Sequence, residues 1–188
     1  MGKVKFGLKN VHYAVVTETA DNSTGEITSS YGTVKEWPGA VSISLDPAGD
    51  DVTFYADDGV YYTAGVNNGY TGTFESAMIP EDVYTAVFGD TKDTNDVIVE
   101  SNNSTRHYIA LMFEFKEDNS GRRNVYYRCS LSRPTVASST TGDTVDVQTD
   151  TVNLTVTPRP DDGKVKAFVE KSEDTTYTNW YQSVYVSA

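Results

Sequence analysis

Hydrophobic and polar residues alternate along most of this chain, and a period of two is typical of strands that bury one face. The clearest case is the segment 41–45, in which Val41, Ile43 and Leu45 are separated by serines. Comparable runs predict further strands at residues 52–55, 60–63, 70–78, 97–100, 107–115, 122–132, 144–157 and 164–170. The chain is therefore expected to be mainly β.

A tight hairpin is predicted where the runs 52–55 and 60–63 flank Ala56-Asp57-Asp58-Gly59. Asp-Gly between two short β runs is a strong hairpin signal, and Gly59 is expected to take the positive φ of the turn. The preceding residues 46–51 are rich in Asp, Pro and Gly, which predicts a loop.

One helix is predicted, with Pro80 at its first position and Gly89 at its end. Val83, Ala86 and Val87 form its apolar stripe, and Tyr84 and Phe88 are spaced to pair at i,i+4. The C-terminal residues 177–188 are expected to form a short helix or a docking arm.

The segment 107–115 is apolar on both faces, so both faces must be covered. Either the helix or a neighbouring subunit is expected to supply the second cover. The returning strand 122–132 is expected to turn one set of side chains inward: Val125, Tyr127, Cys129 and Leu131. In 144–157 the apolar phase changes between Gln148 and Thr151, which predicts a bulge or a crossing between two sheets.

Charge and composition narrow the classes of function. The 188 residues are enough for one domain, and the net charge of −12 argues against binding to nucleic-acid phosphates or anionic membranes. The single cysteine excludes an intrachain disulfide. No signal peptide or membrane-spanning run is recognised, so the protein is expected to fold and assemble in a cytoplasm.

No catalytic, cofactor-binding or metal-binding residue is predicted, and the chain is not expected to be an enzyme. His12 and His107 are the only histidines and no nucleophile turn accompanies them. One Cys and two distant His do not form a zinc site, and Cys129 is expected to pack as a small apolar residue. Arg122 and Arg123 are expected at a solvated rim or in an inter-subunit ion pair.

Two alternative binding sites stay open beside the prediction of a chain without catalytic or metal-binding residues. Carboxylates on two adjacent loops would suit calcium, although Asp is also the usual turn residue; the set is Asp46, Asp50, Asp51, Asp57 and Asp58. Trp37, Trp180 and the 13 tyrosines would suit a sugar-binding platform, as in a lectin-like carbohydrate-binding β-sandwich.

Several segments, taken in order, resemble the major tail proteins of long, non-contractile bacteriophage tails, most closely those of phages that infect Gram-positive hosts. The segments are residues 7–14, 39–45, 54–59, 78–89, 108–113 and 179–185. The resemblance implies two packed antiparallel sheets, sandwich-like or barrel-like, with one short flanking helix. It also implies hexameric rings that stack into a tail tube around a tape-measure protein, between tail terminator and baseplate proteins. Viral DNA would pass through this virion conduit without specific binding.

The resemblance also implies where subunits meet. It makes residues 1–188 a single tail-tube domain with an N-terminal arm at about 1–10 and an inter-ring loop at about 46–63. The candidate subunit contacts are Phe6, Leu8, Phe54, Tyr55 and Asp57.

Overall fold

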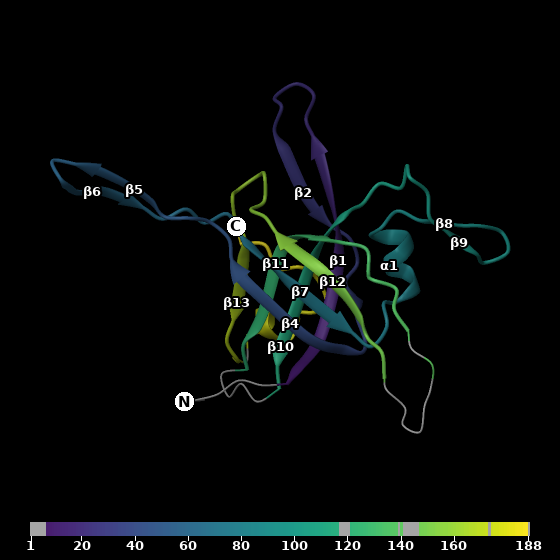
Figure 1. Cartoon of the computed structure of the whole chain (residues 1–188). Coiled ribbons are helices and arrows are strands. Elements are labelled where there is room, and N and C mark those ends of the chain that lie inside the picture. The colour runs from purple at the N-terminus through teal and green to yellow at the C-terminus, as the bar shows by residue number, and fades with distance from the viewer. Residues whose placement is uncertain (1–6, 117–120, 139, 141–146, 173, 188) are drawn as a thin grey trace.

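Thirteen strands and two short helices make up the described part of the chain (Figure 1). The computed structural model describes residues 7–116, 121–138, 140, 147–172 and 174–187. The expectation of a mainly β protein is confirmed. The elements are β1 (Leu8–Ala20), β2 (Ile27–Tyr31), β3 (Lys35–Glu36), β4 (Ala40–Pro47), β5 (Val52–Ala56), β6 (Gly59–Ala64), β7 (Tyr70–Ser76), α1 (Glu81–Ala86), β8 (Thr91–Lys92), β9 (Ile98–Val99), β10 (Tyr108–Phe115), β11 (Arg123–Leu131), β12 (Asp150–Val156), β13 (Lys166–Val169) and α2 (Thr175–Thr178).

Nine strands form one antiparallel sheet that folds over on itself. The order is β2-β1-β10-β11-β12-β7-β4, with β13 also on β11 and β3 also on β1. The two halves of β11 pair with different strands: residues 123–126 pair with β13, and residues 129–131 pair with β12. The ribbon β12-β7-β4 therefore lies across β1 and β10 (Figure 1). The arrangement is sandwich-like, but its two layers are joined through β11 and are not separate sheets.

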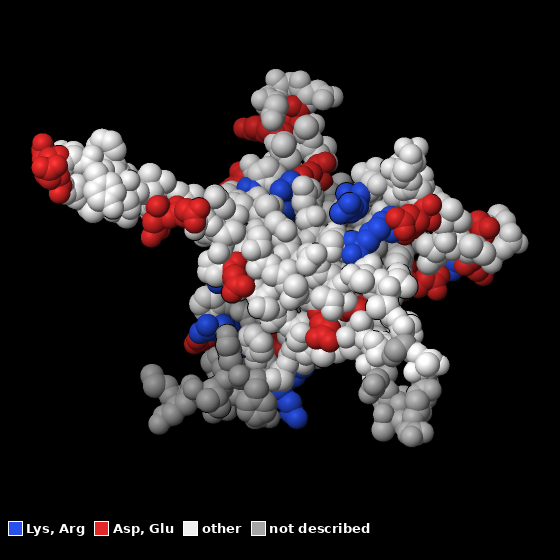
Figure 2. All heavy atoms as spheres, viewed as in Figure 1, with Lys and Arg blue, Asp and Glu red and all other residues white. Residues whose placement is uncertain are grey.

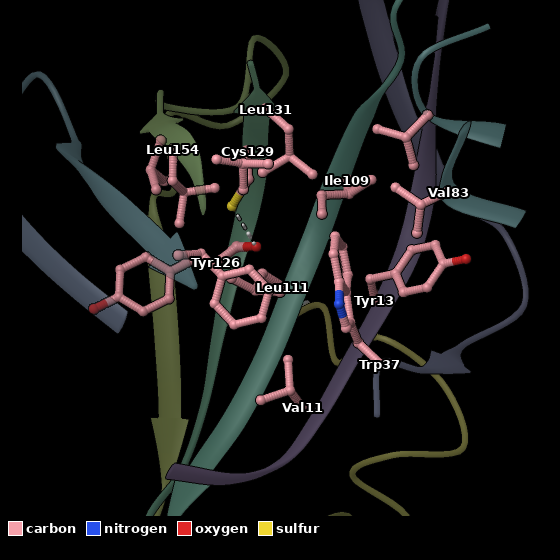
Figure 3. Close-up of a cluster of buried hydrophobic side chains, with 14 of the residues drawn as sticks. Val11, Tyr13, Trp37, Val83, Ile109, Leu111, Tyr126, Cys129, Leu131 and Leu154 are labelled. Carbon is pink, nitrogen blue, oxygen red and sulfur yellow. Dashed lines mark hydrogen bonds between the residues drawn. The ribbon is translucent and has the colours of Figure 1, made fainter. Parts of the chain in front are cut away.

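The main core fills the space between these layers (Figure 3). Trp37 lies at its centre, edge-on to Tyr13 at 5.5 Å and to Phe74 at 5.1 Å between ring centroids. Its indole Nε1 donates a hydrogen bond to Ser76 Oγ at 3.1 Å. Because Tyr13 belongs to β1 and Phe74 to β7, this one side chain connects the two layers.

Helix α1 flanks the sandwich at one side and is shorter than its sequence signal (Figure 1). Pro80 is the N-cap and not the first helical residue, and the helix ends at Ala86, with Val87 as its C-cap, before Gly89, whose φ is 73°. Val83 is fully buried in the main core, and Tyr84 contacts Phe88 edge-on at 5.7 Å. A second helix, α2, adds one turn near the C-terminus at Thr175–Thr178, so it lies at the start of the segment for which a short helix or a docking arm was expected.

The second face of β10 is covered by the chain's own C-terminal segment. Ala110 and Met112 of β10 pack with Val125 and Tyr127 of β11, and Trp180 closes this second cluster. Neither of the two covers expected from the sequence is the one observed. Helix α1 packs on the opposite face, where Val83 meets the main core. The C-terminal residues are thus a docked segment that the monomer needs for its own core.

A bulge in β11 corrects the expected inward face. Ile109 pairs with Cys129, but Leu111 pairs with Tyr126, so β11 carries one extra residue between these positions. Val125 and Tyr127 consequently face the second cluster, whereas Cys129 and Leu131 face the main core. Figure 3 shows the Cys129 thiol directed at the carbonyl oxygen of Tyr126, 3.5 Å away.

The change of phase predicted within 144–157 marks the start of a strand. β12 begins at Asp150 and alternates regularly to Val156, with Val152, Leu154 and Val156 buried. Val147 lies before the strand and is exposed, and Val145 lies outside the described residues. The expected bulge or sheet crossing is therefore wrong for the described part of this segment. Within the described residues no helix has the length and apolarity needed to cross a bilayer.

Candidate subunit interface

The hairpin of β5 and β6 projects from the body of the molecule as a separate arm (Figure 1). Asp57 and Asp58 form its two-residue turn with φ of 51° and 59°, the left-handed pair typical of a type I′ hairpin. The sequence correctly predicts the hairpin, but it assigns the positive φ to Gly59, which instead begins β6. Asp can occupy this conformation because its short side chain bonds locally to the backbone.

The arm exposes large apolar side chains on both of its strands. Six residues each leave between 55% and 72% of their surface in solvent: Val52, Phe54, Tyr55, Val60, Tyr61 and Tyr62. Phe54 and Tyr61 contact each other edge-on with ring centroids 6.4 Å apart, a contact within the arm itself. An isolated two-stranded hairpin is only marginally stable in water, and exposed apolar patches of this kind mark interaction surfaces. The arm is therefore the best candidate for a docking segment.

The five residues expected to contact other subunits fall into three groups. Phe54, Tyr55 and Asp57 come together on the arm. Leu8 begins β1, pairs with Phe115 of β10 and is half-buried against the main core. Phe6, with the rest of the N-terminal arm before residue 7, lies outside the described residues.

Sequence reasoning missed further residues of the same surface, namely Val52, Val60, Tyr61 and Tyr62. The run Val60-Tyr61-Tyr62 places large apolar residues at consecutive positions, so both faces of β6 carry them. In a strand that lies at a protein surface one face is usually polar. The run Val60-Tyr61-Tyr62 could therefore have predicted, from the sequence, that both faces of this strand contact other groups.

The charged residues of the arm and its root are all acidic. No Lys or Arg occurs between Lys35 and Lys92. Asp57 and Asp58 lie at the tip, and Asp50 and Asp51 precede the root, where Figure 2 shows separate acidic groups. Any surface that accepts the arm is expected to offer positive charge and apolar side chains together.

The sheet offers a second kind of contact at its two ends. β2 and β4 are the terminal strands of the described sheet order, and each pairs with one neighbour. A terminal strand presents backbone groups that another chain can pair with. β4 leads directly towards the arm, so the two features lie next to each other along the chain.

The geometry of the described residues does not support the calcium site, the sugar-binding surface at the two tryptophans or a nucleophilic Cys129. Among the described residues no group of three or more His, Cys, Asp or Glu side chains is placed to hold a metal ion. Trp37 and Trp180 are each 2% exposed, so neither can stack on a sugar ring. Cys129 is fully buried, and burial raises the pKa of its thiol, which opposes formation of a nucleophilic thiolate.

Arg122, Arg123 and His12 each have a side-chain partner within the chain. Arg122 pairs with Glu170 at 2.8 Å and Arg123 with Glu114 at 3.0 Å. His12 stacks on Tyr181 with ring centroids 4.4 Å apart.

No protein-family model matches this sequence, and a search of curated proteins finds no match to it.

Proposed function

We propose that this protein is a structural subunit that assembles with copies of itself into stacked hexameric rings, forming the tail tube of a long-tailed bacteriophage. The observation that carries the proposal is the β5–β6 arm, a hairpin with an acidic turn whose six large apolar side chains are each at least 55% exposed in the single chain. The order of sequence segments that resembles major tail proteins supports the same assignment. In that setting the tube surrounds a tape-measure protein and ends at terminator and baseplate proteins.

The arrangement of contacts favours a polymer over a closed dimer. The arm extends away from its own body, so the surface that receives it belongs to another molecule (Figure 1). A contact between two different surfaces of identical chains repeats head to tail, and it yields rings or open filaments. Free edges on β2 and β4 would let neighbouring sheets join, which removes exposed edges from a closed ring.

The charge of the chain suits a conduit for DNA. With a net charge of −12, the assembled wall would repel phosphates instead of retaining them. DNA would then pass through without specific contacts. A basic wall would bind the same polymer in a salt-dependent way and slow its passage.

Electron microscopy and sedimentation velocity of the purified chain test the proposal. We expect rings or tubes that become more abundant with concentration. A matched control replaces residues 52–64 with Asn-Gly, which removes the arm; Asp51 and Gly65 already lie close together at its root, where a Cβ on Gly65 would be 3.3 Å from Asp51 Oδ1. We expect this variant to stay folded and monomeric. A wild-type chain that remains monomeric at the highest soluble concentration contradicts the proposal.

A glycan array separates this proposal from the lectin-like alternative. Tyr55, Tyr61 and Tyr62 are exposed aromatic rings, and such rings also stack on sugars. We expect no glycan to bind. Binding that is present in the wild type and lost without the arm, in a chain that forms no rings, would instead support carbohydrate recognition.

A further inference from the structure

A groove opens at the side of the sandwich between β4 and β13. It has a volume of about 250 Å³, and Ile43 and Leu45 of β4 form one wall. The other side chains that line it are Phe113, Phe115, Arg122, Asn124, Tyr126 and Lys166. Ile43, Leu45 and Phe115 are only half-buried, so the groove presents apolar surface at its mouth.

Positive charge surrounds this apolar surface. The Lys166 ammonium lies 4.6 Å from the ring centre of Tyr70 and forms no ion pair with a described carboxylate. The Arg122 guanidinium lies 4.3 Å from the ring centre of Phe168, and its side chain is 41% exposed beside Glu170. An adjoining hollow, which shares Phe115, is lined by the cations Lys9, Lys116, Arg123 and Lys171 and by Glu114, which pairs with Lys9 and Arg123. In a chain of net charge −12 this is a marked local concentration of basic groups.

We propose that this groove, between β4 and β13, is the receptor for the tip of the β5–β6 arm of a second copy of this chain. Asp57 and Asp58 of the incoming arm pair with Arg122 and Lys166, and the apolar residues behind the turn contact Ile43 and Leu45. The inference rests on the proposed self-assembly and names the surface that completes it. Tip and groove are complementary in two respects, because each combines apolar side chains with charge and the charges are opposite.

The groove and the arm are made of different residues, so each copy can give an arm and accept one. The arm's own groove is not its partner, since every large apolar residue of the arm is at least 55% exposed in the single chain. A head-to-tail series follows from one donor surface and one acceptor surface per copy.

A double-mutant cycle on the full chain tests the pairing. One variant carries Asp57→Asn and Asp58→Gly, because Asn-Gly preserves the type I′ turn while it removes both charges. The other carries Arg122→Gln and Lys166→Gln. The readout is the concentration at which half of the protein is assembled in sedimentation velocity, and we expect each variant to raise it by about tenfold or more.

The combined variant decides whether the two sets of charges act on each other. We expect it to assemble about as well as the weaker of the two variants, since the cations lose their role once the carboxylates are gone. Effects that multiply, or a groove variant that assembles like the wild type, would overturn the inference. A control with Lys92→Gln and Arg106→Gln changes net charge equally away from the groove and should assemble normally.

Cross-linking gives an answer without substitutions. A carbodiimide activates a carboxylate, and the Lys amine then forms an amide bond as the activating group leaves as its urea. In mixed ¹⁴N and ¹⁵N copies we expect a link from Asp57 or Asp58 to Lys166 that contains both isotopes. Links to other lysines only would overturn the inference and leave the proposed self-assembly standing, whereas a wild type that never assembles would contradict the proposed function.

Discussion

The sharpest test of the arm is to remove two of its exposed rings and keep its strands. Phe54→Thr with Tyr61→Thr does this, because Thr is itself a good strand residue. Phe54 and Tyr61 are 58% and 72% exposed in the single chain, so their loss hardly changes the packing of the body. We expect the free energy of unfolding to change by no more than about 1 kcal/mol, which includes the loss of their mutual edge-on contact.

Assembly should respond far more strongly. An aromatic side chain buries about 200 Å², and roughly two thirds of that is available here for each ring. At about 25 cal/mol per Å², complete burial of both would contribute about 6 kcal/mol, and half of that is a realistic share after the ordering of side chains on binding. A loss of about 3 kcal/mol raises the assembly midpoint roughly a hundredfold.

The assay is a sedimentation velocity titration beside thermal unfolding of the same samples. Met78→Thr is the matched control, because Met78 is 71% exposed but lies outside the arm. Assembly that is unchanged in the double variant would refute the role given to the arm. An equal loss in the Met78 control would show that exposed apolar surface acts without regard to its place.

Three further predictions concern the body of the protein. Trp180→Ala should lower the free energy of unfolding by about 3–5 kcal/mol in a guanidinium titration, because Trp180 closes the second cluster. Tyr185→Ala is the control, since Tyr185 is 40% exposed, and it should lower the free energy of unfolding by no more than about 1 kcal/mol. Equal losses in the two variants would contradict the role of the C-terminal segment. Hydrogen bonds from Arg133 hold the pKa of the buried Asp90 below its usual value, so the ionised pair stabilises the fold above that usual value and loses its effect as pH falls through the lowered pKa. Asp90→Asn should therefore cost about 3 kcal/mol at pH 7, and its difference from the wild type should shrink below about pH 4; a constant difference would count against the pair. Cys129 should resist alkylation in the native protein and react only on unfolding, as followed by mass spectrometry, and labelling at the rate of a free thiol would show that the core opens.

Local features were well predicted where neighbours in sequence decide them. The hairpin, the presence of the short helix and the return from β10 to β11 all depend on residues within a few positions of one another, although the helix ends at Ala86 and not at Gly89. The error at Gly59 is of the same kind and is small: Asp57 and Asp58 were able to supply the left-handed turn themselves.

The bulge in β11 shows why an alternating pattern is insufficient. Val125, Tyr127, Cys129 and Leu131 alternate without interruption in the sequence. The extra residue in the pairing with β10 turns half of them to the opposite face. From Val125 to Tyr127 both faces are apolar and buried, so no polar residue within that run marks the change of face.

The sequence by itself determined that this chain is mainly β, that it carries a hairpin with an Asp-Asp turn, and that its net charge is strongly negative. These properties follow from alternation, turn residues and charge, which are read locally. Only the tertiary structure decided that the C-terminal segment covers β10, that β11 joins two layers, and that the hairpin extends into solvent. Those outcomes depend on contacts between distant residues, such as Val15 with Ile109 and Met112 with Trp180, which no local period records.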